Sequence, residues 1–328
     1  MLASALRNGE LVSIPTETVY GLGANGLDPE AMDKIYAAKG RPSDNPLILH
    51  VPNSESIKPL VTEVSNTAQL LMDTFWPGPL TITLPKSDLV PDRATGGLSR
   101  VALRCPDHEA CRVLLERAGI PIAAPSANIS GRPSPTTAED VYNDMNCRIS
   151  YILDAGPCTI GVESTVVEVH DDKVIILRPG GITKAQLERV VSTVEYDTAL
   201  VNATTIPKAP GMKYTHYAPD APMTVVVGRP EGVAHTFKEL SEGIEGPIGC
   251  LVSHETYNLI KGDTRFICHC FGHHSDALSL GHDFYKSLLH FNENHVTLIL
   301  AEGVDDDGFG VAIMNRMEKA SSHHIIYK

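Results

Sequence analysis

The stretch Ile120-Pro121-Ile122-Ala123-Ala124-Pro125-Ser126-Ala127-Asn128-Ile129-Ser130-Gly131 runs from an apolar segment directly into a polar loop. Residues 120–124 are all apolar or proline, which predicts a short strand in the centre of a sheet. Ser126 and Asn128 follow two residues apart, in the kind of connection where α/β proteins place functional side chains. The stretch therefore predicts an α/β fold with hydrogen-bonding groups at the end of a central strand.

A second polar segment, Lys39-Gly40-Arg41-Pro42-Ser43-Asp44-Asn45-Pro46, follows a predicted helix that begins at Asp28-Pro29 and ends at Gly40. Lys39 and Arg41 have two interpretations: solvated cations that complement the helix dipole, or ligands of a small anion held by the loop. The chain has no G-x-x-x-x-G-K-S/T motif and no G-x-G-x-x-G that opens a helix after a strand. A nucleotide would therefore be bound by another kind of loop.

The composition is that of an ordinary globular protein, with 42% hydrophobic and 20% charged residues among 328. A chain of this length favours two domains. No apolar run reaches the roughly 18 residues of a membrane span, and the first ten residues lack the features of a secretory signal. Seven cysteines without regular spacing favour free thiols in a reducing compartment. We therefore expect a cytoplasmic protein, with a mitochondrial location left open.

The net charge of −13 is spread evenly along the chain. Tight nonspecific binding of nucleic acid depends on many contacts with phosphates, so this charge argues against it. A local basic pocket is still compatible with an acidic surface.

The first 190 residues alternate strand-like and helix-like segments, which predicts an α/β domain. Helices are expected to start at Asp28, Asp107, Thr136 and Thr183, each with a capping residue, and a polar turn is expected over residues 15–23. The expected strands are residues 11–14, 47–51, 80–84, 101–103, 120–124, 151–153, 165–169 and 174–177.

Residues 193–222 are rich in proline and have no periodic apolar face, which predicts a linker between domains. Strands at βα spacing follow, over residues 223–227, 248–252, 265–270 and 296–300. We therefore expect a catalytic-type domain over residues 1–192, a linker over 193–222, and a smaller Rossmann-like parallel sheet over 223–328.

Arg100 and Arg104 bracket a predicted strand, so that residues 100, 102 and 104 share one face of it. Two guanidinium groups and Ala102 make a poor core layer but a good floor for phosphates or a carboxylate. An exposed edge strand is the alternative. Arg178 repeats this arrangement at the end of another strand, with Gly180 and Gly181 behind it.

Other polar residues have both a structural and a functional interpretation. Thr18 lies in the Gly-rich turn over residues 15–23, which suits either an ordinary turn or a pocket wall. Ser134 and Ser164 suit caps or turns as well as ligand contacts. His50 ends a strand, where a histidine is more often packed than functional.

The run Cys268-His269-Cys270-Phe271-Gly272-His273-His274 contains residue types that bind metals. Structural zinc normally needs two ligand pairs separated by a longer stretch, so we do not expect a metal site here.

Taken together, these motifs resemble the two-domain form of the threonylcarbamoyl-AMP synthase family, whose first domain is of the YrdC type. The resemblance spans nearly the whole chain. The matching segments are residues 15–23, 39–46, 76–81, 124–131, 163–165, 178–180, 209–219 and 312–316.

The resemblance implies a twisted, open mixed sheet around a positively charged cavity, similar to dihydroxybutanone-phosphate synthase, plus a Rossmann-like C-terminal domain. It also implies a nucleotidyltransferase that joins L-threonine, bicarbonate or CO2, and ATP into threonylcarbamoyl-AMP and diphosphate. The product serves the modification of the adenosine beside the tRNA anticodon, through a downstream transferase complex. Mg2+ is expected with ATP, no protein side chain is assigned as its ligand, and a homodimer is possible.

The resemblance also implies roles for individual residues. Residues expected at the L-threonine site are Thr18, His50, Arg104, Ala124 and Ser164. Residues expected to bind ATP are Arg41, Asn45, Arg100, Ser126, Asn128, Ser134, Arg178 and Tyr217. Lys39, Arg41 and Arg178 are expected to act in catalysis, and the linker with Tyr217 is expected to cover the site as a lid.

Two other classes of function remain open. An RNA-binding module, for double-stranded RNA or tRNA, would show steeply salt-dependent affinity without diphosphate release. A carbamoyl-transfer enzyme that uses carbamoyl phosphate would normally carry further domains, which this sequence does not show.

Overall fold

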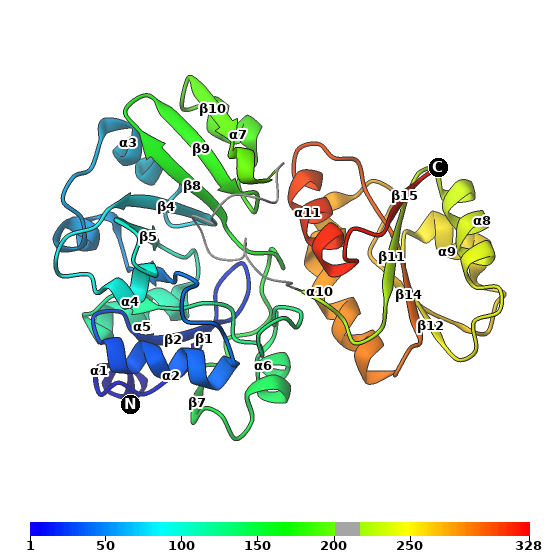
Figure 1. Ribbon diagram of the computed structural model, residues 1–328, viewed down its shortest axis with the longest axis horizontal. Coiled ribbons are helices and arrows are strands. Elements are labelled where there is room, and N and C mark those ends of the chain that lie inside the picture. Colours follow the sequence, from blue (N-terminus) through cyan, green and yellow to red (C-terminus); the bar gives the residue numbers. More distant parts are fainter. Residues whose placement is uncertain (201–216) are drawn as a thin grey trace. The chain divides into compact units, whose positions relative to one another are not determined.

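The computed structural model describes residues 1–200 and 217–328, without the side chain of Ala199. It divides into two compact units (Figure 1). Of the described residues, the first unit contains 1–130, 134–159 and 163–200, and the second contains 131–133, 160–162 and 217–328. Residues 201–216, which make up most of the linker and lid expected over residues 193–222, lie outside the described residues.

The first unit is built on a mixed sheet with the order β10-β9-β8-β4-β5-β3-β6-β2-β1-β7. The short apolar strand β6 lies between β3 and β2, so its predicted central position is confirmed. The strands are β1 (Val12–Ile14), β2 (Gly21–Asn25), β3 (Ile48–His50), β4 (Leu80–Pro85), β5 (Arg100–Arg104), β6 (Ile122–Ala123), β7 (Tyr151–Ile152), β8 (Thr165–His170), β9 (Lys173–Arg178) and β10 (Thr193–Tyr196).

Short helices connect these strands. The cap expected at Asp107 was wrong, because α5 has His108 at its N-cap without a side-chain hydrogen bond, and the box expected from Thr136 forms one residue later. The Asp28 side chain accepts a hydrogen bond at the start of α2, and Gly40 ends that helix in the left-handed conformation. Thr137 and Thr183 each close a capping box. The helices are α1 (Leu2–Arg7), α2 (Pro29–Lys39), η1 (Ser54–Leu60), α3 (Asn66–Phe75), α4 (Asp92–Thr95), α5 (Glu109–Ala118), α6 (Ala138–Met145), α7 (Lys184–Glu188) and η2 (Thr198–Leu200).

The last three residues of the polar turn expected over residues 15–23 belong to a strand, so that prediction was wrong for residues 21–23. Strand β2 pairs antiparallel with β1 through Val12 and Gly23. A Cβ on Gly23 would lie 2.9 Å from Ile122 Cγ2 and 3.0 Å from Val12 O. The glycine is therefore required by close strand packing rather than by a turn.

The predicted linker also begins too early. Residues 193–196 form β10, which pairs parallel with β9 and buries Val194. The prolines that indicated a linker all lie after this strand, at Pro207 and beyond. The first unit therefore keeps its edge strand within the segment that proline content assigned to the linker.

The pairing of the central strands divides their side chains between a core face and a face that carries buried polar groups. Pairing of Ile82 with Leu103, and of Leu103 with Leu49, fixes which side chains lie on the same face. The apolar face belongs to the main core and includes Leu49, Ile82, Leu103, Val167 and Ile176. The opposite face carries His50, Thr81, Thr83, Arg100, Arg104, Glu168 and Arg178.

The second unit is a doubly wound parallel sheet, as the sequence predicts, with the order β13-β12-β14-β11-β15. Helices α8 and α9 contact each other, as do α10 and α11 (Figure 1). The elements are β11 (Met223–Val227), α8 (Pro230–Leu240), β12 (Ile248–Val252), α9 (His254–Ile260), β13 (Phe266–Cys270), α10 (Ala277–Glu293), β14 (Leu298–Glu302), α11 (Gly310–Ala320) and β15 (Ile325–Tyr327).

The cysteine and histidine run of this unit is divided between separate interactions. His273 contacts Glu255, whereas His274 Nδ1 lies 2.8 Å from Oε1 of the buried Glu302. Within residues 1–200 and 217–328, no group of three or more His, Cys, Asp or Glu is arranged to hold a metal ion. No helix in the same ranges is long and apolar enough to cross a bilayer.

Candidate active site

Lys39 is the last residue of α2, and its ammonium group holds the loop after β6. The side chain is 2% exposed, and Nζ donates to the backbone oxygens of Ser126 and Asn128, each at 2.5 Å. Burial lowers the pKa of Lys39 well below its usual value, and the nearby Arg41 lowers it further. The predicted alternative of a solvated helix end is therefore wrong for Lys39.

Backbone hydrogen bonds place the same loop against the connection from β1 to β2. Ala127 N donates to Tyr20 O at 2.8 Å, and Leu22 N donates to Pro125 O at 2.7 Å. Ala124 N donates to Ile48 O at 3.0 Å, so the loop starts beside β3. A Cβ on Gly21 would lie 3.2 Å from Ala124 Cβ, which makes this approach close.

Arg104 ends β5 with its guanidinium group buried among polar partners. Nη1 donates to Thr18 Oγ1 at 2.9 Å, and Nε donates to Gly78 O at 3.3 Å. Nη2 lies 2.8 Å from Glu17 Oε1, and both side chains of this ion pair are nearly inaccessible to solvent. The structure thus brings two predicted threonine-site residues, Thr18 and Arg104, into direct contact.

His50 lies opposite Arg104 in the pairing of β3 with β5. Its Nδ1 is 3.2 Å from Ile48 O, and the ring is buried. Burial, together with the positive charge of Arg104, lowers the pKa of His50 to about 3. The imidazole is therefore neutral at physiological pH and contributes shape and hydrogen bonding rather than charge.

Ser164 and Arg178 continue the polar row on the same face of the sheet. Arg178 Nη2 donates to the backbone oxygen of Ser164 at 2.9 Å and lies 3.2 Å from its hydroxyl oxygen. The Ser164 hydroxyl is 2.8 Å from that of Thr81, and the pairing of β4 with β5 places Thr81 beside Arg104. Glu163, the residue before Ser164, accepts a hydrogen bond at Oε1 from the hydroxyl of the buried Ser134 at 2.7 Å.

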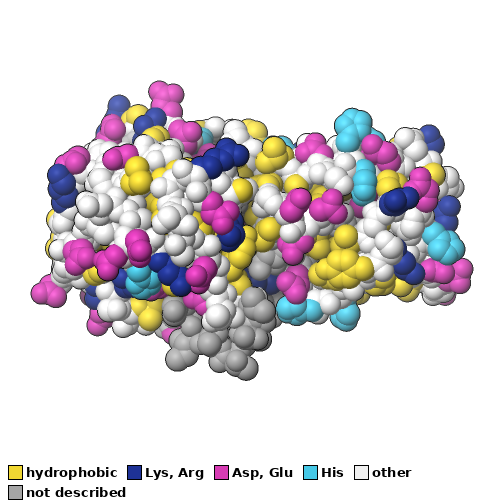
Figure 2. Space-filling model, turned by 90° about the horizontal axis from the view of Figure 1, so that it is seen from above, with side chains coloured by type: hydrophobic (Ala, Val, Ile, Leu, Met, Phe, Trp, Pro, Cys, Tyr) yellow, Lys and Arg dark blue, Asp and Glu magenta, His cyan; other side chains and the backbone are white. Residues whose placement is uncertain are grey.

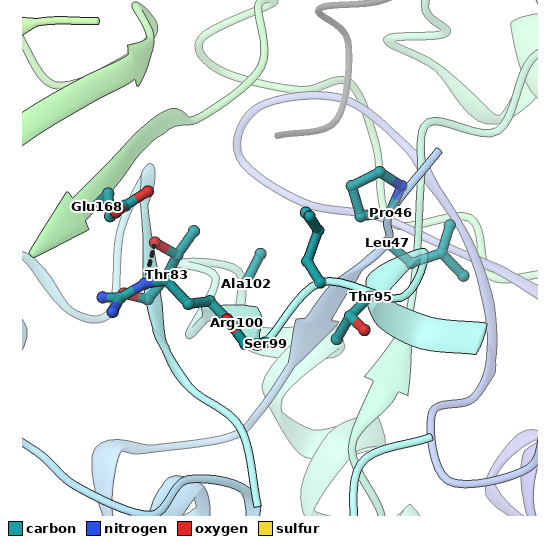
Figure 3. Close-up of a pocket in the computed structure, with 9 residues that line it drawn as sticks. Pro46, Leu47, Thr83, Thr95, Ser99, Arg100, Ala102 and Glu168 are labelled. Atoms are coloured by element: carbon teal, nitrogen blue, oxygen red, sulfur yellow. Dashed lines mark hydrogen bonds between the residues drawn. The ribbon is translucent and has the colours of Figure 1, made fainter. Parts of the chain in front are cut away.

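Arg100 lies at the other end of β5, four residues from Arg104 and thus about 13 Å along the strand. It lines a pocket of about 230 Å³ together with Pro46, Leu47, Thr83, Thr95, Leu98, Ser99, Ala102 and Glu168 (Figure 3). Its Nη2 donates to Thr83 O at 2.7 Å and to Val169 O at 2.9 Å. Arg100 and Arg104 lie on the same face of the sheet, but their guanidinium groups have different partners and lie at separate places on that face.

Three further predicted ATP ligands lie in different surroundings. Arg41 Nη2 donates to Pro46 O at 3.2 Å. Asn45 is 3% exposed, and its side-chain Nδ2 has no hydrogen-bond partner within the part of the chain that the structure describes. Tyr217 belongs to the second unit, where its ring lies 5.3 Å from that of Tyr285.

Glu17 is the acidic residue of this site that sequence reasoning did not select. It lies between two threonines in a segment that resembles an exposed polar turn. The signal available was its position three residues after the buried strand that ends at Ile14.

A mixed α/β sheet with buried arginines, threonines and serines along one face is the framework of an α/β protein whose polar face suits small anionic molecules. The family model described as "Telomere recombination" matches residues 4–180, and that described as "Threonylcarbamoyl-AMP synthase, C-terminal domain" matches residues 182–322. The chain belongs to the threonylcarbamoyl-AMP synthase family, in its two-domain form.

Relatives match over the full length. Threonylcarbamoyl-AMP synthase from Bacillus subtilis is 46% identical over 99% of this chain and 93% of its own length. The synthase from Pyrococcus abyssi is 43% identical over 99% of this chain and 94% of its own length. The crystal structure of P. abyssi Sua5 complexed with L-threonine has a TM-score of 0.90 and 42% identity, covering 99% of this chain and 94% of that one.

Proposed function

We propose that this chain is an L-threonylcarbamoyladenylate synthase, a nucleotidyltransferase that converts L-threonine, bicarbonate or CO2, and ATP into threonylcarbamoyl-AMP and diphosphate. The observation that carries the proposal is the buried contact of Arg104 with Thr18, beside the neutral His50. A buried guanidinium suits the carboxylate of an amino acid. The full-length similarity to a structure solved with L-threonine supports the same substrate.

The proposed reaction needs no nucleophile from the protein. The amine of threonine captures CO2 to form a carbamate, whose oxygen attacks the α-phosphorus of ATP while diphosphate leaves. Catalysis of this kind depends on positioning and on neutralising charge. Arg41 and Arg178 supply positive charge, and Lys39 fixes the loop that carries Ser126 and Asn128.

The ATP assignment is supported by two features of the first unit. The amide nitrogen of Asn45 is buried and has no partner among residues 1–200 and 217–328, which is costly unless a ligand accepts its hydrogen bond. The pocket beside Arg100 offers apolar and polar groups on the same sheet face as Arg104. Because ATP is elongated, we propose that it extends along this face toward Arg178, with Ser134 and Tyr217 as further ligands.

Mg2+ is proposed as part of the substrate, bound to the phosphates of ATP. Over residues 1–200 and 217–328, no cluster of three or more metal-ligating side chains is present, so no protein ligand is assigned to it. Hard cations of this kind are commonly held by substrate phosphates and water.

The product would pass to a transferase complex that modifies tRNA, and a homodimer is possible. All seven cysteines are free thiols, which supports the proposed cytoplasmic location. The three-part division into a catalytic domain, a linker that covers the site and a C-terminal domain is likewise proposed, with the first boundary moved to follow β10.

Release of diphosphate from ATP, measured with and without threonine and bicarbonate, tests the proposal. We expect release only when both are present. Because one methyl group in an apolar pocket is worth about 1–3 kcal/mol, serine should be used with a lower kcat/KM by roughly 10- to 200-fold. Equal kcat/KM for serine and threonine would remove threonine as the defining substrate.

RNA binding without catalysis fits the surface less well. On the face seen in Figure 2, Lys and Arg side chains alternate with Asp and Glu and form no continuous basic patch. Salt-dependent RNA affinity without diphosphate release would favour that alternative.

A further inference from the structure

Glu17 is a buried carboxylate with unused hydrogen-bonding capacity. It is 5% exposed, and its Oε2 accepts no hydrogen bond from any residue that the structure describes. Its Oε1 lies 2.8 Å from Nη2 of Arg104, whose positive charge offsets that of the carboxylate. Burying a carboxylate without hydrogen bonds is costly, so this arrangement suits a donor that arrives with a ligand.

The Arg104–Glu17 pair matches the two charges of a free amino acid. A zwitterionic amino acid carries its carboxylate and its ammonium group on the same carbon atom. Two opposite protein charges in contact therefore suit both ends of such a molecule at once, the carboxylate at Arg104 and the ammonium at Glu17. A lone guanidinium would suit any small carboxylate, whereas the pair selects an α-amino acid.

We propose that Glu17 binds the α-ammonium group of threonine and accepts a proton from it, an inference that rests on the proposed function. Threonine enters as R–NH3+, which has no free electron pair with which to attack carbon. Transfer of one proton gives R–NH2 and a neutral Glu17 carboxyl. The amine then forms an N–C bond with CO2, and loss of its second proton to solvent leaves the carbamate R–NH–COO−. Glu17 returns its proton to solvent after product release.

The groups around Glu17 leave it as the only anionic candidate in direct contact with Arg104 among the described residues. Three thiols interact electrostatically with Glu17, those of Cys105, Cys111 and Cys158. Burial raises the pKa of Cys105 to about 11 and the pKa values of Cys111 and Cys158 to about 12, so all three are neutral. His50, next to Arg104, is neutral as well.

Glu17→Gln tests the inference because it keeps the size of the side chain and removes its charge. We expect kcat/KM for threonine to fall about 10²-fold at pH 7, the usual scale for loss of a general base. The remaining rate should depend on the small fraction of threonine that is already deprotonated. The kcat/KM of the Glu17→Gln variant should therefore rise about tenfold per pH unit from pH 7 to 9. The kcat/KM of the wild type should stay constant over the same range.

A binding experiment on the wild-type protein gives a second readout that is independent of the variant's folding. We expect the threonine analogue with a hydroxyl in place of the α-amino group to bind at least tenfold more weakly than threonine in calorimetry. Glu17→Asp, which keeps the charge on a shorter arm, should retain the flat pH profile. Glu302→Gln is the control for loss of a buried carboxylate, since Glu302 lies in the second unit and accepts from Ser253.

The outcomes separate the inference from the function on which it rests. An active wild type with a Glu17→Gln variant whose pH profile stays flat, or a hydroxy analogue that binds as tightly as threonine, overturns the role of Glu17 alone. Either of these two results would leave Glu17 as a structural partner of Arg104. A wild type without threonine-dependent diphosphate release contradicts the proposed function, and the inference fails with it.

Discussion

A buried neutral histidine makes the stability of the first unit depend on pH. The pKa of His50 is about 3 in the folded chain, against about 6.5 when unfolded. Between these values the unfolded chain binds a proton that the folded chain does not, so acid favours unfolding. We expect His50 to remove about 1.4 kcal/mol of stability per pH unit as pH falls through this window. Urea unfolding at pH 7 and pH 5 should show a smaller loss for His50→Asn than for the wild type.

Removing the ammonium group of Lys39 should lower activity, because this group holds the loop that carries Ser126 and Asn128. Lys39→Met leaves the backbone oxygens of Ser126 and Asn128 without their donor. We expect kcat/KM to fall at least 10²-fold and unfolding free energy to fall by about 2 kcal/mol. Lys34→Met is the matched control, because Lys34 lies on the same helix and donates to Gly9 O at 2.7 Å instead of to the loop after β6. If both variants lose activity equally, the loop contact is not the cause.

Individual residues differ in how far the sequence could reveal them. The face on which Arg104 lies was predictable, because alternation along a strand places it with Arg100 on a face unsuited to a core. Glu17 was not, since its burial comes from contact with a strand far along the chain. The separate location of the Arg100 pocket was equally hidden, because alternation fixes a face and leaves open where on it a ligand binds.

At the scale of elements, the two ends of the polar face of β5 predict separate effects on the two substrates. Ala102 lines the pocket beside Arg100, whereas Val101 and Leu103 point into the core. Ala102→Leu should fill part of the pocket and raise KM for ATP about tenfold, with KM for threonine unchanged. Ala102→Ser, which adds little volume, should leave both values near those of the wild type. A rise in threonine KM instead would place the amino acid in this pocket.

Elements with strong local signals were predicted well, and those that depend on distant partners were not. Helix α2 has an Asp cap, a Pro at its first turn and a Gly stop, all of which act locally. Strand β2 has the composition of a turn and becomes a strand only because β1 and β6 flank it. Strand β15 likewise depends on β11 for its pairing and had no separate signal.

At the scale of the whole molecule, the boundary after β10 predicts where the first unit can be cut. A chain that ends at residue 200 keeps the complete sheet, whereas one that ends at 192 lacks β10 with its buried Val194 and leaves the edge of β9 unpaired. Losing the burial of one valine costs about 2 kcal/mol, before the lost pairing is considered. Urea unfolding should therefore show the shorter chain to be less stable by at least this amount. Equal stability would mean that residues 193–196 belong to the linker after all. Both chains should have depressed activity, because Tyr217, proposed as an ATP ligand, is absent from each.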